Sequence, residues 1–202
     1  LPHHALRNGG IAMSAPLSTR RFTVDEYHRM AEAGILDRDE RVELLDGEII
    51  VMSPIGSRHA AAVDRLNHGL TRRAGQRAIV RVQNPIVLGS HGEPQPDVCL
   101  LKPRADFYAG AHPRAEDVLL VVEVADTSDQ DDRERKIPAY ARAGIPEAWL
   151  VALPADAVEV YREPMPEGYR EVRRLERGAT LTPLRLPELT LAVDDVLGPR
   201  PH

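Results

Sequence analysis

The sequence is poor in cysteine and has no long apolar run. Cys99 is the single cysteine in 202 residues, which excludes an internal disulfide and a zinc site built from several thiolates. No apolar stretch approaches the roughly 20 residues that a membrane-spanning helix needs, so we expect no membrane partner. The first residues contain no apolar signal core, which makes the cytoplasm the expected location. We expect residues 1–20 to be a disordered or extraneous leader and residues 21–198 to form one domain.

Lysine is scarce as well, and the charge balance is acidic. The net charge of −5 excludes a protein that coats nucleic acid non-specifically, although it permits an enzyme that meets DNA on one face. Lys102 and Lys136 are the only lysines, and arginine supplies the other basic side chains. Arginine is used at nearly all positions where only a positive charge is needed. A lysine in such a sequence is therefore a candidate for a chemical role.

Predicted helices alternate with predicted strands along the chain. A capping box from Thr23 to Glu26 begins a helix that Gly34 would end, and Asp46-Gly47 between apolar runs predicts a β-hairpin. The further predicted elements are a helix capped by Ser57, strands within 77–88, 97–101, 118–125 and 147–152, a helix from about 129 to 143, and a hairpin within 158–175. This order predicts an α/β domain whose central mixed sheet is flanked by helices and preceded by an N-terminal helix and hairpin.

Acidic residues interrupt the apolar strands. Val118 to Val122 is typical of a strand buried on both faces, and Glu123 follows it where an unpaired carboxylate would cost several kcal/mol. Asp97 begins a neighbouring strand, and Glu43 lies within the first hairpin. Carboxylates that converge at one sheet repel unless a cation lies between them, and hard oxygen ligands favour Mg²⁺ or Mn²⁺. Lys136, in the helix that follows, could orient an attacking water or stabilise charge on a phosphate.

These residues resemble the Uma-two family of restriction-endonuclease-like proteins, within the PD-(D/E)XK nuclease superfamily. The resemblance covers Phe22 to Leu197. The motifs that carry it are Pro96-Asp97, Val121-Val122-Glu123-Val124 with Thr127-Ser128, Lys136, Tyr140, Gly144 and Pro146-Glu147-Ala148-Trp149-Leu150-Val151, and upstream Glu43-Leu44, Asp46-Gly47-Glu48, Ser53-Pro54 and His59.

The resemblance implies a restriction-endonuclease-like fold and a Mg²⁺-dependent (or Mn²⁺-dependent) endonuclease that hydrolyses phosphodiester bonds of DNA. Asp97 and Glu123 would then be catalytic acids that bind the metal, with the carbonyl of Val124 as an extra ligand. Glu43 would be an additional catalytic acid from the N-terminal element. DNA is the expected partner, and association of two copies as a homodimer is left open.

The catalytic lysine is the point at which the chain departs from the superfamily pattern. That pattern places the lysine two residues after the second acid, where this chain has Ala125. The resemblance assigns the role to Lys136 in the next helix instead. Pro138 could kink that helix and turn Lys136 away from the acids.

Each candidate also has a structural interpretation. Glu123 could pair with an arginine, and Asp97 could accept hydrogen bonds from backbone amides at a strand start. Glu43 could lie on the solvent-exposed face of the hairpin, and Lys136 could be a solvated helix residue paired with Asp132.

We expect three further motif residues to have structural rather than catalytic roles. His59 lies near a helix start, where histidine is more often a local hydrogen-bond partner than a catalytic group. Tyr140 and Trp149 are expected to pack in the core rather than stack on bases.

Arginines recur along the second predicted helix. Arg58, Arg65 and Arg72 are spaced by seven residues and form a stripe that could contact phosphates or could be an ordinary solvated face.

Two other functions stay open. A non-catalytic nucleic-acid-binding or assembly protein with the nuclease fold is one. The other is a metal hydrolase of small phosphates, although the chain shows no Gly-rich phosphate loop.

Overall fold

The fold was analysed in a computed structural model, which describes residues 19–200 apart from 38 and 127–131. Most of the expected leader at 1–20 therefore lies outside the described residues. The motif residues Thr127-Ser128 lie outside them entirely. The elements, in order, are α1 (Val24–Glu32), β1 (Val42–Leu45), β2 (Glu48–Val51), α2 (Ser57–Ala74), β3 (Ile79–Val82), β4 (Val98–Leu101), the 3₁₀ turn η1 (Ala115–Asp117), β5 (Val118–Ala125), the π-helical turn η2 (Asp132–Lys136), α4 (Ile137–Arg142), β6 (Glu147–Ala152), β7 (Ala157–Met165), β8 (Gly168–Glu176), β9 (Thr180–Leu181), β10 (Leu191–Ala192) and α5 (Val193–Leu197).

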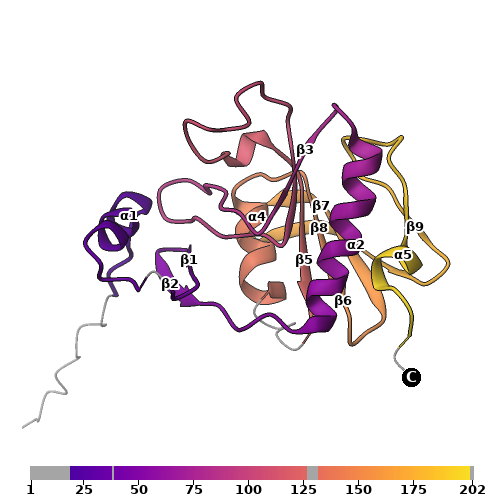
Figure 1. The fold of residues 1–202 in the computed structure, drawn as a ribbon, viewed down its shortest axis with the longest axis horizontal. Helices are drawn as coiled ribbons and strands as arrows, with labels where there is room; N and C mark the ends of the chain where they lie inside the picture. Colours follow the sequence, from indigo (N-terminus) through magenta and orange to yellow (C-terminus); the bar gives the residue numbers. More distant parts are fainter. Residues whose placement is uncertain (1–18, 38, 127–131, 201–202) are drawn as a thin grey trace, which may run out of the picture.

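A six-stranded mixed sheet forms the centre of the molecule (Figure 1). Its strand order is β3-β4-β5-β6-β7-β8, and β5 and β6 run parallel while the other neighbouring strands are antiparallel. A parallel pair needs a crossover connection, and η2 with α4 supplies it. The predicted α/β fold with a central mixed sheet flanked by helices is therefore confirmed.

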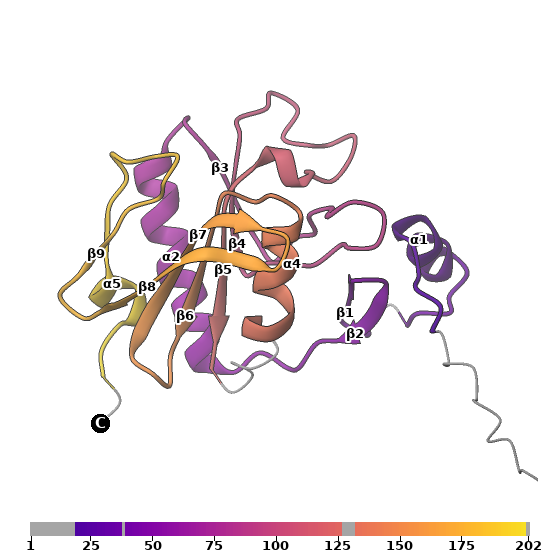
Figure 2. The same ribbon diagram turned by 180° about the vertical axis from the view of Figure 1, so that it is seen from behind.

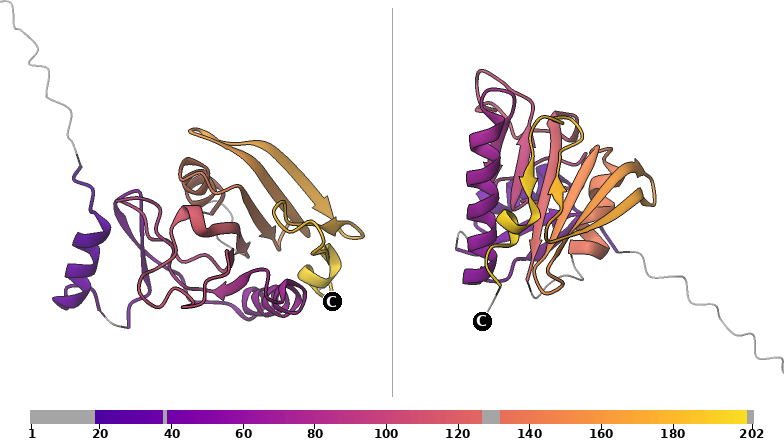
Figure 3. Two further views of the ribbon diagram at one scale, coloured as in Figure 1. Left: turned by 90° about the horizontal axis from the view of Figure 1, so that it is seen from above. Right: turned by 90° about the vertical axis from the view of Figure 1, so that its right-hand side faces the viewer.

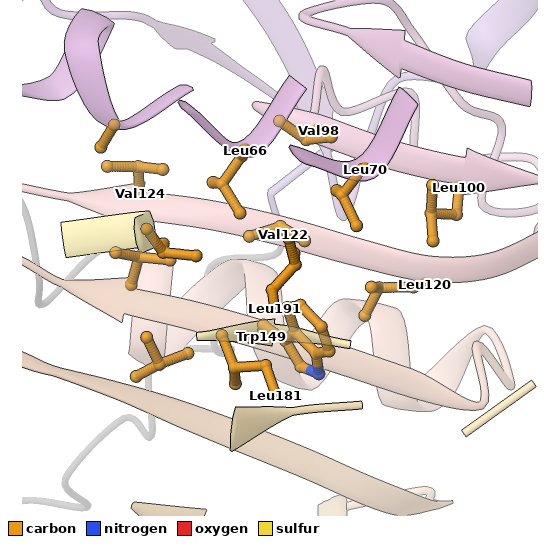
Figure 4. Close-up of a cluster of buried hydrophobic side chains, with 14 of the residues drawn as sticks. Leu66, Leu70, Val98, Leu100, Leu120, Val122, Val124, Trp149, Leu181 and Leu191 are labelled. Carbon is orange, nitrogen blue, oxygen red and sulfur yellow. The ribbon is translucent and has the colours of Figure 1, made fainter. Parts of the chain in front are cut away.

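The two faces of the sheet pack against different helices. Side chains of alternate residues point to opposite faces of a strand, so Val122 faces α2 while Val121 faces α4. Leu66 and Leu70 of α2 pack on the first face, where Trp149 is fully buried as predicted (Figure 4). The right-hand view of Figure 3 shows α2 and α5 on one side of the sheet. The two-faced burial predicted for Val118 to Val122 follows from this layering.

An N-terminal arm of α1 and the β1–β2 hairpin lies beside the sheet (Figures 1 and 2). Asp46 and Gly47 both have positive φ angles, 51° and 78°, which is the turn geometry that this dipeptide predicts. Reciprocal backbone hydrogen bonds between Leu44 and Glu93 attach β1 to the loop before β4. This attachment brings Glu43 to the same end of the sheet as Asp97.

Some predicted boundaries were wrong. The N-cap of α2 is Gly56, which makes no side-chain capping bond, and Ser57 is already helical. The strand expected within 77–88, with an interruption at Asn84-Pro85, covers Ile79–Val82 and ends just before that dipeptide, where Gln83 takes a left-handed conformation (φ 50°). Of the helix expected from about 129, residues 129–131 lie outside the described part, and the described part changes from π-helical to α-helical at Ile137. Pro138 lies in the first turn of α4, where a missing N–H costs little.

Within the part of the chain that the structure describes, no helix is long and apolar enough to cross a bilayer.

A buried carboxylate at the start of β6 connects distant elements. Glu147 is fully buried and accepts hydrogen bonds from Trp149 Nε1 at 3.0 Å and from Nε and Nη2 of Arg162 at 2.9 and 2.7 Å. The backbone N–H of Leu184 donates a further bond of 2.5 Å to the same carboxylate. Glu147 therefore ties β6 and β7 to the segment that follows β9.

We expect Glu147→Ala to lower the free energy of unfolding by about 3–5 kcal/mol, because it leaves the guanidinium of Arg162 and two further donors without their acceptor. Chemical denaturation monitored by circular dichroism measures the effect. The matched control is Glu176→Ala, whose exposed side chain should contribute less than about 0.5 kcal/mol. A loss below about 1 kcal/mol for Glu147→Ala would contradict this account.

Candidate active site

A cavity of about 290 Å³ lies between the N-terminal arm and one end of the central sheet. Its lining residues come from the hairpin, the segment before α2, the first turn of α2, the ends of the sheet strands and η2. They are Arg41, Glu43, Leu45, Ile50, Val51, Met52, Ser53, Pro54, Ile55, Gly56, His59, Gln83, Asp97, Glu123, Val124, Asp126, Arg135 and Lys136. The structure thus brings together all five residues proposed for the site from sequence, although their catalytic roles stay predictions.

The strand register places three polar side chains in a row. Val82 pairs with Val98 and Val98 pairs with Val122. One residue further toward the same end of the sheet, this register brings Gln83, Asp97 and Glu123 next to one another on three adjacent strands. The row lies at the C-terminal end of β5, where the sheet borders the cavity.

Asp97 is held by three hydrogen bonds. Its Oδ2 accepts bonds from the backbone N–H of Val124 at 2.9 Å and from His59 Nε2 at 3.0 Å, and its Oδ1 accepts one from Gln83 Nε2 at 3.2 Å. Burial by itself would raise the pKa of Asp97, but the hydrogen bonds from His59 and Val124 and the charges of His59 and Lys136 together lower it. Asp97 is therefore ionised at neutral pH. Its backbone-amide partner, which the structural interpretation anticipated, comes from the neighbouring strand.

Lys136 supplies the charge that compensates Glu123. Its Nζ lies 3.2 Å from Glu43 Oε1 and 3.4 and 3.5 Å from the two carboxylate oxygens of Glu123. The exposed fractions of these side chains are only 10% for Lys136, 4% for Glu43 and 2% for Glu123. Two structural alternatives are therefore wrong: Glu43 does not face solvent, and Lys136 is not a solvated residue.

The crossover after β5 positions Lys136. Arg133, one turn earlier, forms a bidentate ion pair with Glu159 on β7, and Arg135 pairs with Glu48 of the hairpin at 2.5 Å. These pairs hold η2 between the sheet and the arm, so the proline in α4 does not turn Lys136 away from the acids.

Sequence reasoning missed three residues of the site. His59 was set aside as a local partner, yet its ring bonds to Asp97, 38 positions along the chain. The hydroxyl of Tyr140 donates a hydrogen bond to Glu123 Oε1 in addition to packing in the core. The four-residue spacing from Lys136 puts Tyr140 on the same helix face, and that signal could have found it. No signal marks Gln83, because its left-handed backbone is invisible in the sequence.

Comparisons with known proteins identify the family and the fold of the chain. The Uma2 family model, described as "Putative restriction endonuclease", matches residues 24–194. The chain belongs to the Uma2 family. A solved structure described as a "putative nuclease belonging to DUF820", from Anabaena variabilis ATCC 29413, is similar with a TM-score of 0.68 and 19% identity, covering 87% of this chain and 97% of that chain. This likeness shows that the Uma2 chain has the restriction-endonuclease-like fold. A search of curated proteins found no match.

The oxygen donors of this Uma2 chain suit a hard divalent cation. Among the described residues, no three His, Cys, Asp or Glu side chains form a group that could hold a metal ion. Mg²⁺ often keeps several waters and takes only one or two carboxylates from the protein, and the Asp97 and Glu123 carboxylates at one cavity wall meet that need. The carbonyl of Val124 is the third candidate donor. These oxygen donors therefore fit a divalent cation chemically. The ammonium group of Lys136 already places one positive charge between Glu43 and Glu123.

We expect Lys136→Met to lower the free energy of unfolding at neutral pH by about 3–5 kcal/mol, because it leaves the carboxylates of Glu43 and Glu123 buried without their cation. The control is Lys102→Met, which changes the only other lysine, at an exposed position. The double variant Glu43→Gln/Lys136→Met should recover part of the loss, since one uncompensated charge is removed. Equal stability of the two lysine variants would contradict this assignment.

The Arg133–Glu159 pair predicts a pH dependence of stability. Burial would raise the pKa of Glu159, but hydrogen bonds from Tyr161 and Arg133 lower it below the ordinary value of 4.5. Because the folded-state pKa is lower than the unfolded one, the stabilisation is complete above the ordinary value. It is lost as the pH falls through the folded-state pKa.

We therefore expect the free energy of unfolding to fall as the pH is lowered below about 4.5, and to fall less steeply in Glu159→Gln. Urea unfolding between about pH 7 and pH 3 measures both curves. Glu167→Gln, at an exposed position, is the control and should follow the wild type. Parallel curves for the wild type and Glu159→Gln would show that this carboxylate has no part in the acid sensitivity.

Proposed function

We propose that the chain is a nuclease that hydrolyses phosphodiester bonds of DNA and depends on Mg²⁺ or Mn²⁺. One observation supports this above the others: two carboxylates from adjacent strands and a buried lysine line a single cavity at the end of a restriction-endonuclease-like sheet. The Uma2 family description and the nuclease description of the similar structure favour the same activity.

In the proposed reaction a water oxygen attacks phosphorus and releases a proton to the solvent. The bond from phosphorus to the leaving oxygen breaks, and the leaving oxygen takes up a proton from the solvent. Asp97 and Glu123, with the Val124 carbonyl, would hold the divalent cation. When bound, such a cation lowers the pKa of a water molecule and stabilises negative charge on the phosphate. Lys136 would donate from Nζ to the attacking water or to a phosphate oxygen, and Glu43 keeps that ammonium group in place.

A phosphate at the mouth of the cavity would meet the N-terminal end of α2. The N-terminal end of the 18-residue helix α2 borders the cavity at Gly56 and His59, and the first turn of α2 contains no acidic residue. A helix N-terminus carries a partial positive charge that attracts anions. Arg41 and Arg135 also line the cavity, and Arg135 is paired with Glu48 of the hairpin.

A non-catalytic nucleic-acid-binding protein is the second candidate function. Two observations favour it: Lys136 lies within ion-pair distance of both Glu43 and Glu123, and Ala125 stands at the usual lysine position.

We expect the wild type to cut plasmid or single-stranded DNA with Mg²⁺ or Mn²⁺ and to stop on addition of chelator. Asp97→Ala and Glu123→Ala should each reduce the cutting rate by more than about 100-fold, because even an outer hydrogen-bond partner of a metal ligand is worth about 10- to 100-fold. Timed digests resolved on gels measure the rates, with Glu176→Gln as an exposed control that should match the wild type.

The same assay separates the alternatives. Cutting that persists in both acid variants comes from a contaminant and contradicts the proposal. Gel shifts without cutting would support the non-catalytic function. Hydrolysis of mononucleotides but not of polymers would support a hydrolase of small phosphates, and RNA supplied in place of DNA tests the choice of polymer.

A further inference from the structure

A second cavity, of about 260 Å³, is rich in arginine. It lies where α2 approaches α5 and the C-terminal segment, which Figure 2 shows side by side. The residues that line it are Arg58, Ala61, Arg65, Leu153, Asp156, Arg177, Leu197, Pro199 and Arg200. Four of these nine described residues are arginines and one is acidic, so the lining carries an excess of positive charge.

The single lining carboxylate is already engaged. Asp156 accepts two hydrogen bonds from Arg177, each of 2.7 Å. Arg65 donates instead to the carbonyls of Val196 and Leu197, at 3.0 and 2.9 Å. Burial and then the neighbouring charge of Arg177 lower the pKa of Arg65, while the charge of Asp64 acts in the opposite direction. Arg65 therefore adds positive charge that its carbonyl partners do not neutralise.

Arg58 connects this cavity to the candidate active site. Its Nη1 lies 3.3 Å from Asp126, which lines the first cavity, and its Nη2 donates to the carbonyl of Leu153, which lines the second. Arg200 Nε lies 3.5 Å from Asp156 Oδ2. Arg58 and Arg200 remain accessible, with exposed side-chain fractions of 44% and 74%. A guanidinium has five N–H donors, so both can bind a further anion while keeping these contacts.

We infer that the second cavity binds a backbone phosphate of the same nucleic-acid strand whose scissile phosphate enters the first cavity. Guanidinium groups suit phosphate oxygens in charge and geometry, and two adjoining cavities joined at Arg58 suit a polymer with one phosphate per nucleotide. This inference rests on the proposed function and adds a substrate-binding site to it.

The structure also divides the arginine stripe predicted from the sequence. Arg58 and Arg65 line the second cavity, whereas Arg72 does not and instead lies 3.4 Å from His68 on its own helix. Only the first two members of the stripe are therefore assigned to phosphate binding.

The test is fluorescence anisotropy with labelled duplex DNA and labelled single-stranded RNA, in chelator so that neither probe is cut. The test variant is Arg58→Ala/Arg200→Ala. The matched control is Arg72→Ala/Arg104→Ala, which removes the same charge at exposed positions outside the cavity, and Arg104, like Arg58, pairs with an aspartate. Thermal denaturation of both variants checks that the fold is intact.

We expect the test variant to bind at least one probe about tenfold or more weakly than the control, and the slope of log affinity against log salt to fall by about 1–2. Equal affinities of the two double variants would overturn the inference, as would an absence of binding to both probes. A third outcome separates this inference from the proposed function. If the test variant alone loses binding, but the wild type cuts neither polymer with Mg²⁺ or Mn²⁺, the phosphate site is upheld and the nuclease function is rejected. The probe that responds identifies the nucleic acid.

Discussion

A buried ammonium group between two buried carboxylates is the interaction on which the candidate site depends. Lys136 contacts Glu43 and Glu123, and these three side chains come from the N-terminal hairpin, the central sheet and the crossover. Two carboxylates with so little solvent would cost several kcal/mol each without a nearby cation. The triad therefore fixes the positions of three separate parts of the chain relative to one another, and it sets the charge that any divalent cation would meet in the cavity.

The topology of the sheet makes this triad possible. Because β5 and β6 are parallel, the chain must return over the sheet between them, and the return carries Lys136 past the end of β5 where Glu123 lies. The antiparallel neighbour β4 brings Asp97 to the same end from the other direction. The site thus lies where β5 ends and its antiparallel neighbour β4 begins. The helices α2 and α4 cover the two faces of the rest of the sheet.

Charge is distributed unevenly over the molecule, which makes the acidic chain compatible with the proposed polyanionic substrate. The net charge is −5, yet arginines gather in the second cavity and the N-terminal end of α2 borders the first. A nucleic-acid strand responds to the local potential more than to the overall charge, because salt screens charges beyond about 10 Å. Arg58 belongs to both regions through its contacts with Asp126 and Leu153, and the two proposed contacts with the substrate are adjacent for that reason.

The sequence by itself determined the kinds of elements and the candidate acids, because helix and strand periodicity, the Asp46-Gly47 turn and a carboxylate after an apolar run are local patterns. It also indicated the mixed sheet, through the order of those elements. Only the tertiary structure decided that Lys136 is the cation beside Glu123, and that residues as distant as His59 and Asp97 bond to each other. Such pairs depend on strand order and register, and no local pattern encodes which distant side chains those features bring together.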